Sequence, residues 1–148
     1  MEVQVLKMAP LPENAFYPIR KRYIADSLLL FLLTRISEKN KYILGATQHD
    51  ISTSKGNIAD WGVMGLGFMP GKACVISTFR IKNNLKNRQH ELERFLKIGL
   101  HELGHNFGLG HCPSQHCIMV DAEGKNKLDG EENLCESCRI ILQKKGIL

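Results

Sequence analysis

The sequence predicts a small, compact α+β domain, with α/β-like alternation of its elements, that spans residues 1–148. Its 148 residues, 43% of them hydrophobic and 24% charged, are typical of one globular domain. Short alternating or β-branched runs, which predict strands, are interleaved with longer segments whose apolar residues recur at helical spacing. The longest apolar run, Leu28–Leu33, has six residues, far fewer than the about 20 that a membrane span needs. We therefore expect no membrane partner.

The N-terminal residues predict a cytoplasmic protein, which we expect to act as a monomer. No apolar stretch follows a basic start in residues 1–16, so we expect no secretory signal. The net charge of +5 comes from 20 basic and 15 acidic residues, an excess too small and too dispersed to favour a nucleic-acid partner. The densest basic stretch, residues 80–97, contains Phe95 as its one aromatic residue, which argues against a stacking platform for single strands.

The first half of the chain is expected to mix strands, a helix and loops. Weak alternation predicts a first strand over Val3–Met8. Residues 9–18 contain three prolines and should be irregular. Helical spacing of apolar residues predicts a buried helix over Arg20–Ser37. A short strand is expected at Tyr42–Thr47, followed by a polar loop over Ile51–Asp60.

The second half carries the clearest elements. Trp61–Phe68 should be extended but glycine-rich, and glycine in a strand often marks a close approach of another backbone. Pro70 and Gly71 predict a turn. Ala73–Ile81 has the strongest strand pattern, and we expect Cys74 within it to be a buried, small apolar residue. A long helix is then expected from about Asn87 to Phe107.

One face of this last helix is predicted to pack on the core. Six residues recur there at about 3.6 residues per turn: Leu92, Phe95, Leu96, Gly99, Leu103 and Phe107. At about 100° per residue, His101 and His105 lie roughly opposite that face. Both histidines should therefore line a surface or a cleft.

Residues 101–112, HELGHNFGLGHC, contain a candidate metal motif. His101 and His105 are i and i+4, about 40° apart around a helix axis and ~6 Å apart along it, so both imidazoles can bind one ion. Glu102 stands beside the first of them and is suited to hold a water on the metal. The motif therefore predicts a catalytic zinc site with Glu102 as its catalytic carboxylate.

A third ligand requires the chain to turn. On a continuing helix, His111 would lie ~9 Å beyond His105 and about 120° away from it. Gly108 can adopt a positive φ without steric cost, so we expect the helix to end there and His111 to come back under the ion. Three neutral histidines and a water give a tetrahedral site with one open position.

Four cysteines near the C-terminus predict a second zinc ion. Cys112 and Cys117 form one short-gap pair, and Cys135 and Cys138 form another, which is the usual plan of a closed structural site. A redox-active pair at Cys135 and Cys138 is the alternative, but no thioredoxin-like βαβ pattern surrounds it. We expect the cysteine site to anchor the segment that carries His111, for a total of two zinc ions per chain.

The HExxHxxGxxH pattern from His101 to His111 resembles the metzincin signature, and the added cysteines resemble an archaemetzincin. The resemblance implies a single metzincin-like catalytic domain over 1–148. Residues 1–108 would hold a small twisted mixed sheet, a backing helix and the active-site helix. Residues 109–148 would form a C-terminal part, stabilised by the four-cysteine zinc site, with Met119 as the methionine of the Met-turn beneath the catalytic metal. The edge strand over the cleft, against which a substrate would lie, would consist of Met64, Gly65, Leu66 and Gly67.

The expected function is a zinc-dependent peptidase that cleaves peptides or proteins through a zinc-bound water activated by Glu102. One alternative is a zinc-dependent endoribonuclease of the rRNA-maturation type. The motif of that family, similar to HGxLHLxGYDH, has glycine where this chain has Glu102. The other alternative is a catalytically silent, zinc-stabilised module that binds peptides.

Overall fold

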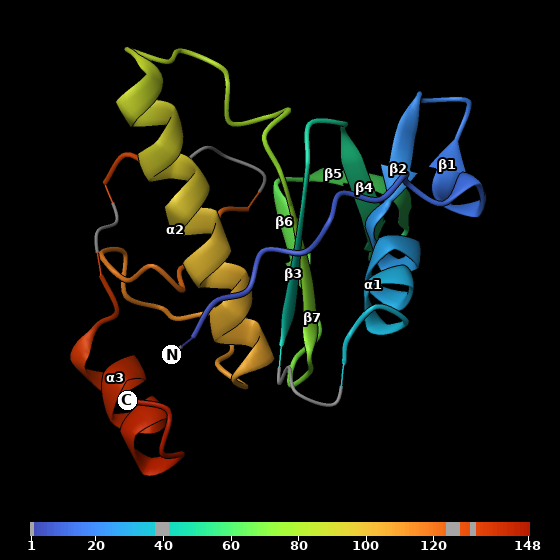
Figure 1. Ribbon diagram of the computed structural model, residues 1–148. Helices are drawn as coiled ribbons and strands as arrows, with labels where there is room; N and C mark the ends of the chain where they lie inside the picture. Colours follow the sequence, from blue (N-terminus) through green and yellow to red (C-terminus); the bar gives the residue numbers. More distant parts are fainter. Residues whose placement is uncertain (1, 38–41, 124–127, 131–132) are drawn as a thin grey trace.

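The computed structural model describes residues 2–37, 42–123, 128–130 and 133–148. Within them, two mixed β-sheets lie beside α-helices, and a 3-10 turn, Glu13–Ala15, precedes the first strand. Figure 1 shows α2 along one side of the strands and α1 along the other. The predicted α+β class is therefore confirmed, with two small sheets in place of the single sheet that we expected.

The four-stranded sheet has the order β1-β2-β4-β5. Its strands are β1 (Phe16–Tyr17), β2 (Arg22–Ile24), β4 (Ile51–Lys55) and β5 (Ile58–Val63). β2 and β4 are parallel, whereas the outer pairs are antiparallel. This sheet brings residues that are about 30 positions apart in the chain to one side of the molecule.

The three-stranded sheet has the order β3-β7-β6. β3 (Ile43–Thr47) runs parallel to β7 (Ala73–Ser77), and β6 (Gly65–Gly67) runs antiparallel to β7 at the edge. All five residues of β7 are buried, which is expected of a central strand covered on both faces. Val75 packs with α1 residues Leu28 and Leu29, whereas Ile76 packs with Ile98 of α2.

The helices are α1 (Ala25–Leu33), α2 (Arg88–Asn106) and α3 (Glu136–Lys144). α2 agrees with the predicted long helix to within one residue at each end, and Asn87 caps it by accepting a hydrogen bond from the His90 amide. The sequence pattern did not predict α3. Among the described helices, none is long and apolar enough to cross a membrane.

Two predictions in the first half of the chain are wrong, and a third is confirmed only in part. Val3–Met8 forms no strand and crosses in front of the strands in Figure 1, with Val5 92% and Met8 94% exposed. The helix predicted over Arg20–Ser37 forms only over Ala25–Leu33, because Arg22–Ile24 form β2, which pairs with β1 and β4. The predicted loop over Ile51–Asp60 is instead most of β4 and β5.

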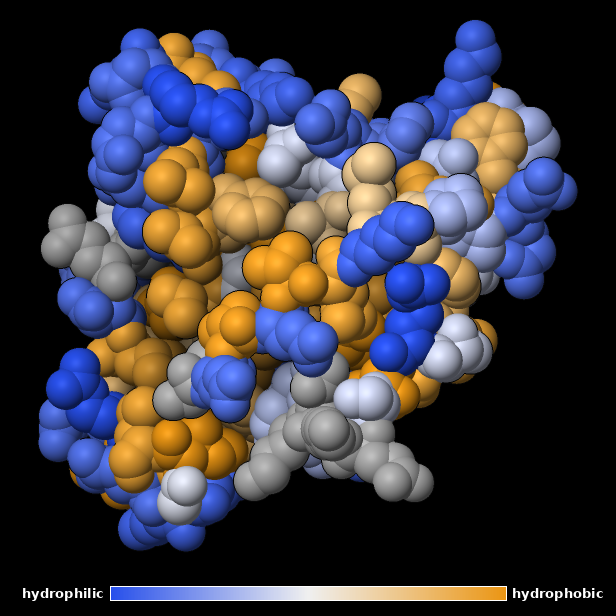
Figure 2. Space-filling view, viewed as in Figure 1, coloured by the Kyte–Doolittle hydropathy of each residue, from blue (hydrophilic) through white to orange (hydrophobic). Residues whose placement is uncertain are grey.

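Two predicted features of the second half differ in part. The strand expected over Ala73–Ile81 ends at Ser77. On α2, the predicted core face is displaced, since Leu92 is 46% and Leu96 53% exposed, and apolar side chains follow this helix on the face in Figure 2. The residues buried on α2 include three polar side chains: Arg94, Glu102 and Asn106. Those of Arg94 and Asn106 donate hydrogen bonds to groups elsewhere in the fold.

Candidate active site

The C-terminal end of α2 carries the predicted turn. The helix ends at Asn106, and Gly108 has a φ of +82°, a conformation that glycine adopts without steric cost. The Leu109 amide donates to the Gly104 carbonyl at 2.9 Å, so the chain reverses at once. His111 is thereby brought back beside the helix, as the spacing predicted.

The three predicted histidines converge on one point. One nitrogen of each of His101, His105 and His111 lies within 4.8 Å of the other two, in an arrangement that could hold a metal ion. The Nε2 atoms of His101 and His105 are 3.1 Å apart. Two nitrogens at zinc distances of 2.0–2.1 Å in a tetrahedron are separated by about 3.3 Å, so the spacing suits that ion.

Hydrogen bonds from the rings decide which nitrogens face inward. His101 Nδ1 is 2.7 Å from the Ile118 carbonyl, and His105 Nδ1 is 2.8 Å from the Leu109 carbonyl. Since carbonyl oxygens only accept, both Nδ1 atoms carry the proton and both Nε2 atoms present lone pairs. Burial lowers the pKa of His101 to about 4 and also lowers the pKa of His105. Two neutral acceptors that face each other this closely fit a cation between them.

His111 has a different environment from the other two histidines. Its Nδ1 lies 3.7 Å from Oδ2 of Asp121, and the two side chains are 49% and 43% exposed. The Glu123 amide donates to the other carboxylate oxygen of Asp121 at 2.9 Å and lowers the pKa of Asp121. Asp121 could not be singled out from the sequence, because an acid two residues after Met119 carries no spacing signal of its own.

Glu102 is buried between α2 and β6. A Cβ atom at Gly65 would lie 2.6 Å from Glu102 Oε1, and one at Gly67 would lie 2.8 Å from the Glu102 carbonyl oxygen. The two glycines therefore let the helix approach the edge strand, as the glycine-rich pattern suggested. Desolvation raises the pKa of the Glu102 carboxyl to about 8, near the value at which a carboxylate is an effective proton acceptor in neutral solution.

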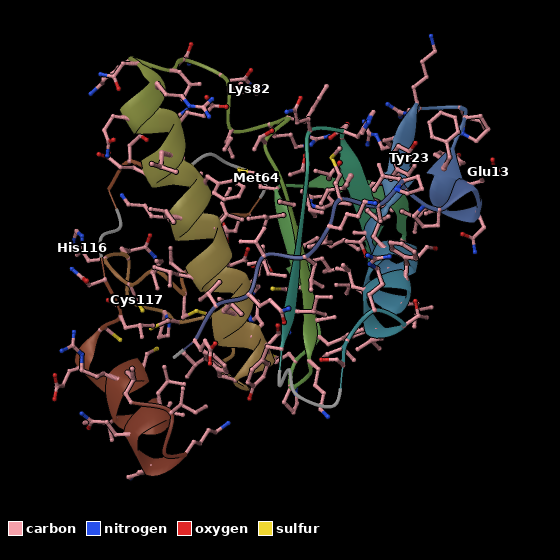
Figure 3. All side chains as sticks on the ribbon, viewed as in Figure 1. Glu13, Tyr23, Met64, Lys82, His116 and Cys117 are labelled. Carbon is pink, nitrogen blue, oxygen red and sulfur yellow. The ribbon has the colours of Figure 1, made fainter. Side chains whose placement is uncertain are left out.

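A cleft of about 550 Å³ opens beside these residues. Its walls come from β4, β5, β6 and α2 and from the segment after Met119. The lining residues include Gly65, Leu66, His101, Glu102, His111 and Asp121. Met64, predicted as part of the edge strand, immediately precedes β6 and packs toward Ile98 of α2, between β6 and α2 in Figure 3. The histidines, Glu102 and the edge strand thus share one cavity.

The four predicted cysteines also come together. The sulfur atoms of Cys112, Cys117, Cys135 and Cys138 lie within 4.8 Å of one another. Cys112 Sγ is 3.6 Å from Cys135 Sγ, and Cys117 Sγ is 3.8 Å from Cys138 Sγ. Disulfide sulfurs are about 2.05 Å apart, whereas two thiolates on a tetrahedral zinc are about 3.8 Å apart. The cluster therefore has the dimensions of a closed zinc site.

Backbone groups complete the cysteine cluster. The amides of Met119 and Cys135 approach Cys117 Sγ at 3.5 and 3.4 Å, as donors to a thiolate would. Figure 3 shows Cys117 near further sulfur atoms in the loop that leads to α3. His116, its neighbour, is exposed and outside the cluster, so four sulfurs suffice as ligands.

Met119 lies between the two clusters. It is fully buried, and its side chain packs so closely on Gly104 that a Cβ there would overlap the sulfur. The Cys112 amide donates to the Met119 carbonyl at 2.8 Å, and Cys112 also forms a bridge with Val120. The preceding residue, Ile118, supplies the carbonyl that orients His101. One short segment therefore contacts both groups of candidate ligands.

The chain is similar to known proteins over nearly its whole length. Residues 6–144 match the model of peptidase family M54. The archaemetzincin of Methanopyrus kandleri is 36% identical over 145 residues, which cover 97% of this chain and 79% of that protein. The archaemetzincin of Haloquadratum walsbyi is 34% identical over 95% of this chain and 83% of its own length.

Solved structures show the same fold. The crystal structure of the Methanopyrus kandleri archaemetzincin matches with a TM-score of 0.80 and 34% identity, over 92% of this chain and 72% of that one. The structure of the archaemetzincin of Archaeoglobus fulgidus, complexed with malonate, matches with a TM-score of 0.77 and 27% identity, over 95% and 82% of the two chains. The chain therefore belongs to peptidase family M54, the archaemetzincins, and is a zinc metallopeptidase.

Proposed function

We propose that this chain hydrolyses peptide bonds in the cleft beside α2, with Glu102 as the general base that accepts a proton from the attacking water. The observation that carries the proposal is one buried carboxylate next to three converging imidazoles in the same cavity. His101, His105 and His111 would hold the catalytic zinc. When bound, this ion would act as a Lewis acid that polarises a peptide carbonyl and makes a water acidic near neutral pH.

Burial suits Glu102 to both proton transfers. Desolvation raises the pKa of its carboxyl to about 8 when no metal ion is bound, so burial makes the carboxylate a stronger base than an exposed glutamate. The proton taken from water would later go to the nitrogen of the departing amine. The same residue thus acts first as base and then as acid.

The edge strand supports a binding mode for an extended peptide. β6 pairs with β7 on one side, and Gly65 and Leu66 line the cleft. A substrate strand could add to the other edge through backbone hydrogen bonds, which glycines leave unobstructed. We therefore propose Met64, Gly65, Leu66 and Gly67 as the segment against which a peptide or protein substrate lies.

We propose a second, structural zinc held by Cys112, Cys117, Cys135 and Cys138, for two zinc ions in one catalytic domain over 1–148. Residues 1–108 would supply the sheets and both packed helices, and residues 109–148 would supply the third histidine and the cysteine site. Four thiolate ligands require reduced cysteines, which supports a cytoplasmic location. We also propose that the protein acts as a monomer without a membrane or nucleic-acid partner.

The test is a digest of casein and of a peptide library by the wild type, Glu102→Gln and Glu93→Gln. Glu93 is an exposed residue on the same helix and serves as a matched control. We expect the wild type and Glu93→Gln to cleave peptides, and Glu102→Gln to lose cleavage while keeping its zinc. Full-rate cleavage by Glu102→Gln would disprove the role of Glu102. Cleavage of RNA alone, in a parallel digest, would replace the proposal with a ribonuclease, and zinc binding without turnover of either would indicate a silent binding module.

A further inference from the structure

We propose that Asp121 is a positioning residue for the third histidine: its carboxylate accepts the Nδ1–H of His111 and so directs Nε2 toward the metal. This inference rests on the proposed zinc site, and it adds a supporting residue to the three histidine ligands that the motif predicted. Asp121 follows the buried Met119 by two residues and lines the same cleft as His111. It would act through His111, without touching the substrate.

The need for such a residue follows from the different environments of the three rings. His101 and His105 are partly buried, and each donates Nδ1–H to a backbone carbonyl at 2.7–2.8 Å. His111 is the most exposed of the three, and the group that faces its Nδ1 is a side chain. An exposed imidazole can rotate about its side-chain bonds, so its aim depends on that partner.

The geometry of Asp121 fits the role of a partner. One carboxylate oxygen, Oδ1, accepts the Glu123 amide at 2.9 Å, and the other, Oδ2, is 3.7 Å from His111 Nδ1. The contact with the Glu123 amide orients the carboxylate. The distance from Oδ2 to His111 Nδ1 is about 1 Å longer than that of a charge-assisted hydrogen bond, which is about 2.8 Å. Because both side chains are half-exposed, ordinary rotations can close that distance.

The same geometry argues against Asp121 as a fourth ligand. The cluster of ligand atoms within 4.8 Å of one another contains the three histidines and not the aspartate. The nitrogen of His111 that Asp121 approaches is Nδ1. With Nε2 turned to the ion, as we propose, a carboxylate on the Nδ1 side would orient the ring and make Nε2 more basic. The open position that hydrolysis needs would remain open.

The experiment measures zinc affinity at the histidine site by competition with a chelator, in full-length protein and without substrate. The variants are Asp121→Asn, Asp121→Ala and Glu123→Gln. Glu123→Gln removes a nearby negative charge while its backbone amide still donates to Asp121, so it controls for long-range electrostatics. We expect Asp121→Ala to bind zinc about 10- to 100-fold more weakly, Asp121→Asn to lie between it and the wild type, and Glu123→Gln to match the wild type.

A double-mutant cycle with His111→Ala separates positioning from a general effect of charge. If Asp121 acts through His111, Asp121→Ala should cause no further loss of zinc affinity once His111 is removed. An equal loss with and without His111, or unchanged affinity in Asp121→Ala, would overturn the inference. The helical circular dichroism signal and the zinc retained at the cysteine site identify any variant that misfolds. If Asp121→Ala misfolds, the zinc affinity of Asp121→Asn, in which the side chain has nearly the same size, tests the inference in its place. An Asp121-dependent affinity in a protein that cleaves no peptide would overturn the proposed function alone.

Discussion

Gly65 of β6 lies so close to Glu102 of α2 that a Cβ atom at position 65 would come within 2.6 Å of the carboxylate oxygen Oε1. The contact joins the edge strand to the buried acid of the cleft. A side chain at position 65 must displace the carboxylate, the strand or both. This position therefore couples the packing of the fold to the geometry of the proposed active site.

We expect Gly65→Ala to lower the free energy of unfolding by about 1–3 kcal/mol, the usual cost of overpacking a well-filled interior, and to reduce peptide cleavage. Thermal or urea unfolding and a peptide assay measure the two effects. Gly130→Ala is the matched control, because no atom of the described residues lies within 4 Å of a Cβ built at Gly130. Equal stability of the two variants would show that Glu102 moves away without cost.

Metal content should separate the two clusters. We expect near two zinc ions in the wild type and near one after replacing His101 and His105 with alanine, since the remaining imidazole cannot hold an ion alone. Replacing Cys135 and Cys138 with serine should also leave near one zinc ion and lower the melting temperature, because a structural zinc contributes folding energy. Elemental analysis of purified protein gives the counts.

His116→Ala is the control for that experiment. His116 lies between Cys112 and Cys117 in the sequence, but it is not part of the sulfur cluster. The variant should retain the wild-type zinc content. Loss of one zinc in His116→Ala would mean that the histidine replaces a thiolate as ligand.

The raised pKa of Glu102 predicts a pH-dependent stability. Its carboxyl shifts from an ordinary value of 4.5 to about 8 on folding, so the folded state binds more protons than the unfolded state between these values. The free energy of unfolding of the zinc-free protein therefore falls, for this group, as pH rises from about 4.5 to about 8. Glu102→Gln removes the effect, and we expect its stability relative to the wild type to rise by about 3 kcal/mol from about pH 5 to about pH 8. Urea unfolding across this range is the measurement, and parallel profiles for the two proteins would contradict the expectation.

Arg94 and Asp129 form an ion pair that attaches residues 128–130 to α2. The Arg94 side chain is 3% exposed and donates to both carboxylate oxygens of Asp129, as well as to the carbonyls of Ile81 and Asn83. We expect Asp129→Ala to cost about 1–3 kcal/mol at neutral pH, because a buried donor loses its charged partner. Glu93→Ala, at an exposed position on α2, should cost under about 0.5 kcal/mol.

The sign of the pH dependence tests this pair. The Arg94 guanidinium holds the pKa of Asp129 well below its usual range, so the stabilisation is present above the unfolded value of 3.8 and is lost as pH falls toward the folded value. The difference in free energy of unfolding between the wild type and Asp129→Ala should therefore become smaller below about pH 4. A gap that stays constant in acid would show that the aspartate acts through something other than its charge.

The region around α2 could be predicted from the sequence, because its information is local. Histidine spacing, a glycine three residues beyond His105 and paired cysteines each have a direct geometric meaning, and the structure places all of these residues together. The buried face of α2 could not be predicted in the same way. The Asn106 Nδ2 group donates to two distant carbonyls, and Arg94 donates to distant carbonyls and a distant carboxylate. No periodicity in the helix encodes those partners.

The errors in the sheets have a related cause. Val3–Met8 alternates like a strand but has no described partner strand, while the polar run at Ile51–Lys55 is a strand because β2 and β5 flank it. Strand formation depends on neighbours supplied by tertiary structure more than on the segment itself. Asp121 was missed for the same reason, since its meaning comes from the ring that faces it.

His111 and Cys112 are consecutive in the chain, and the Cys112 amide is hydrogen-bonded to Met119. An ion bound by the sulfur atoms would restrict the same peptide that presents the third imidazole. Any coupling through this peptide changes the zinc affinity of both sites by the same factor, as thermodynamic reciprocity requires. The order in which the two ions are acquired would consequently change the pathway of maturation but not the combined free energy of the fully loaded protein.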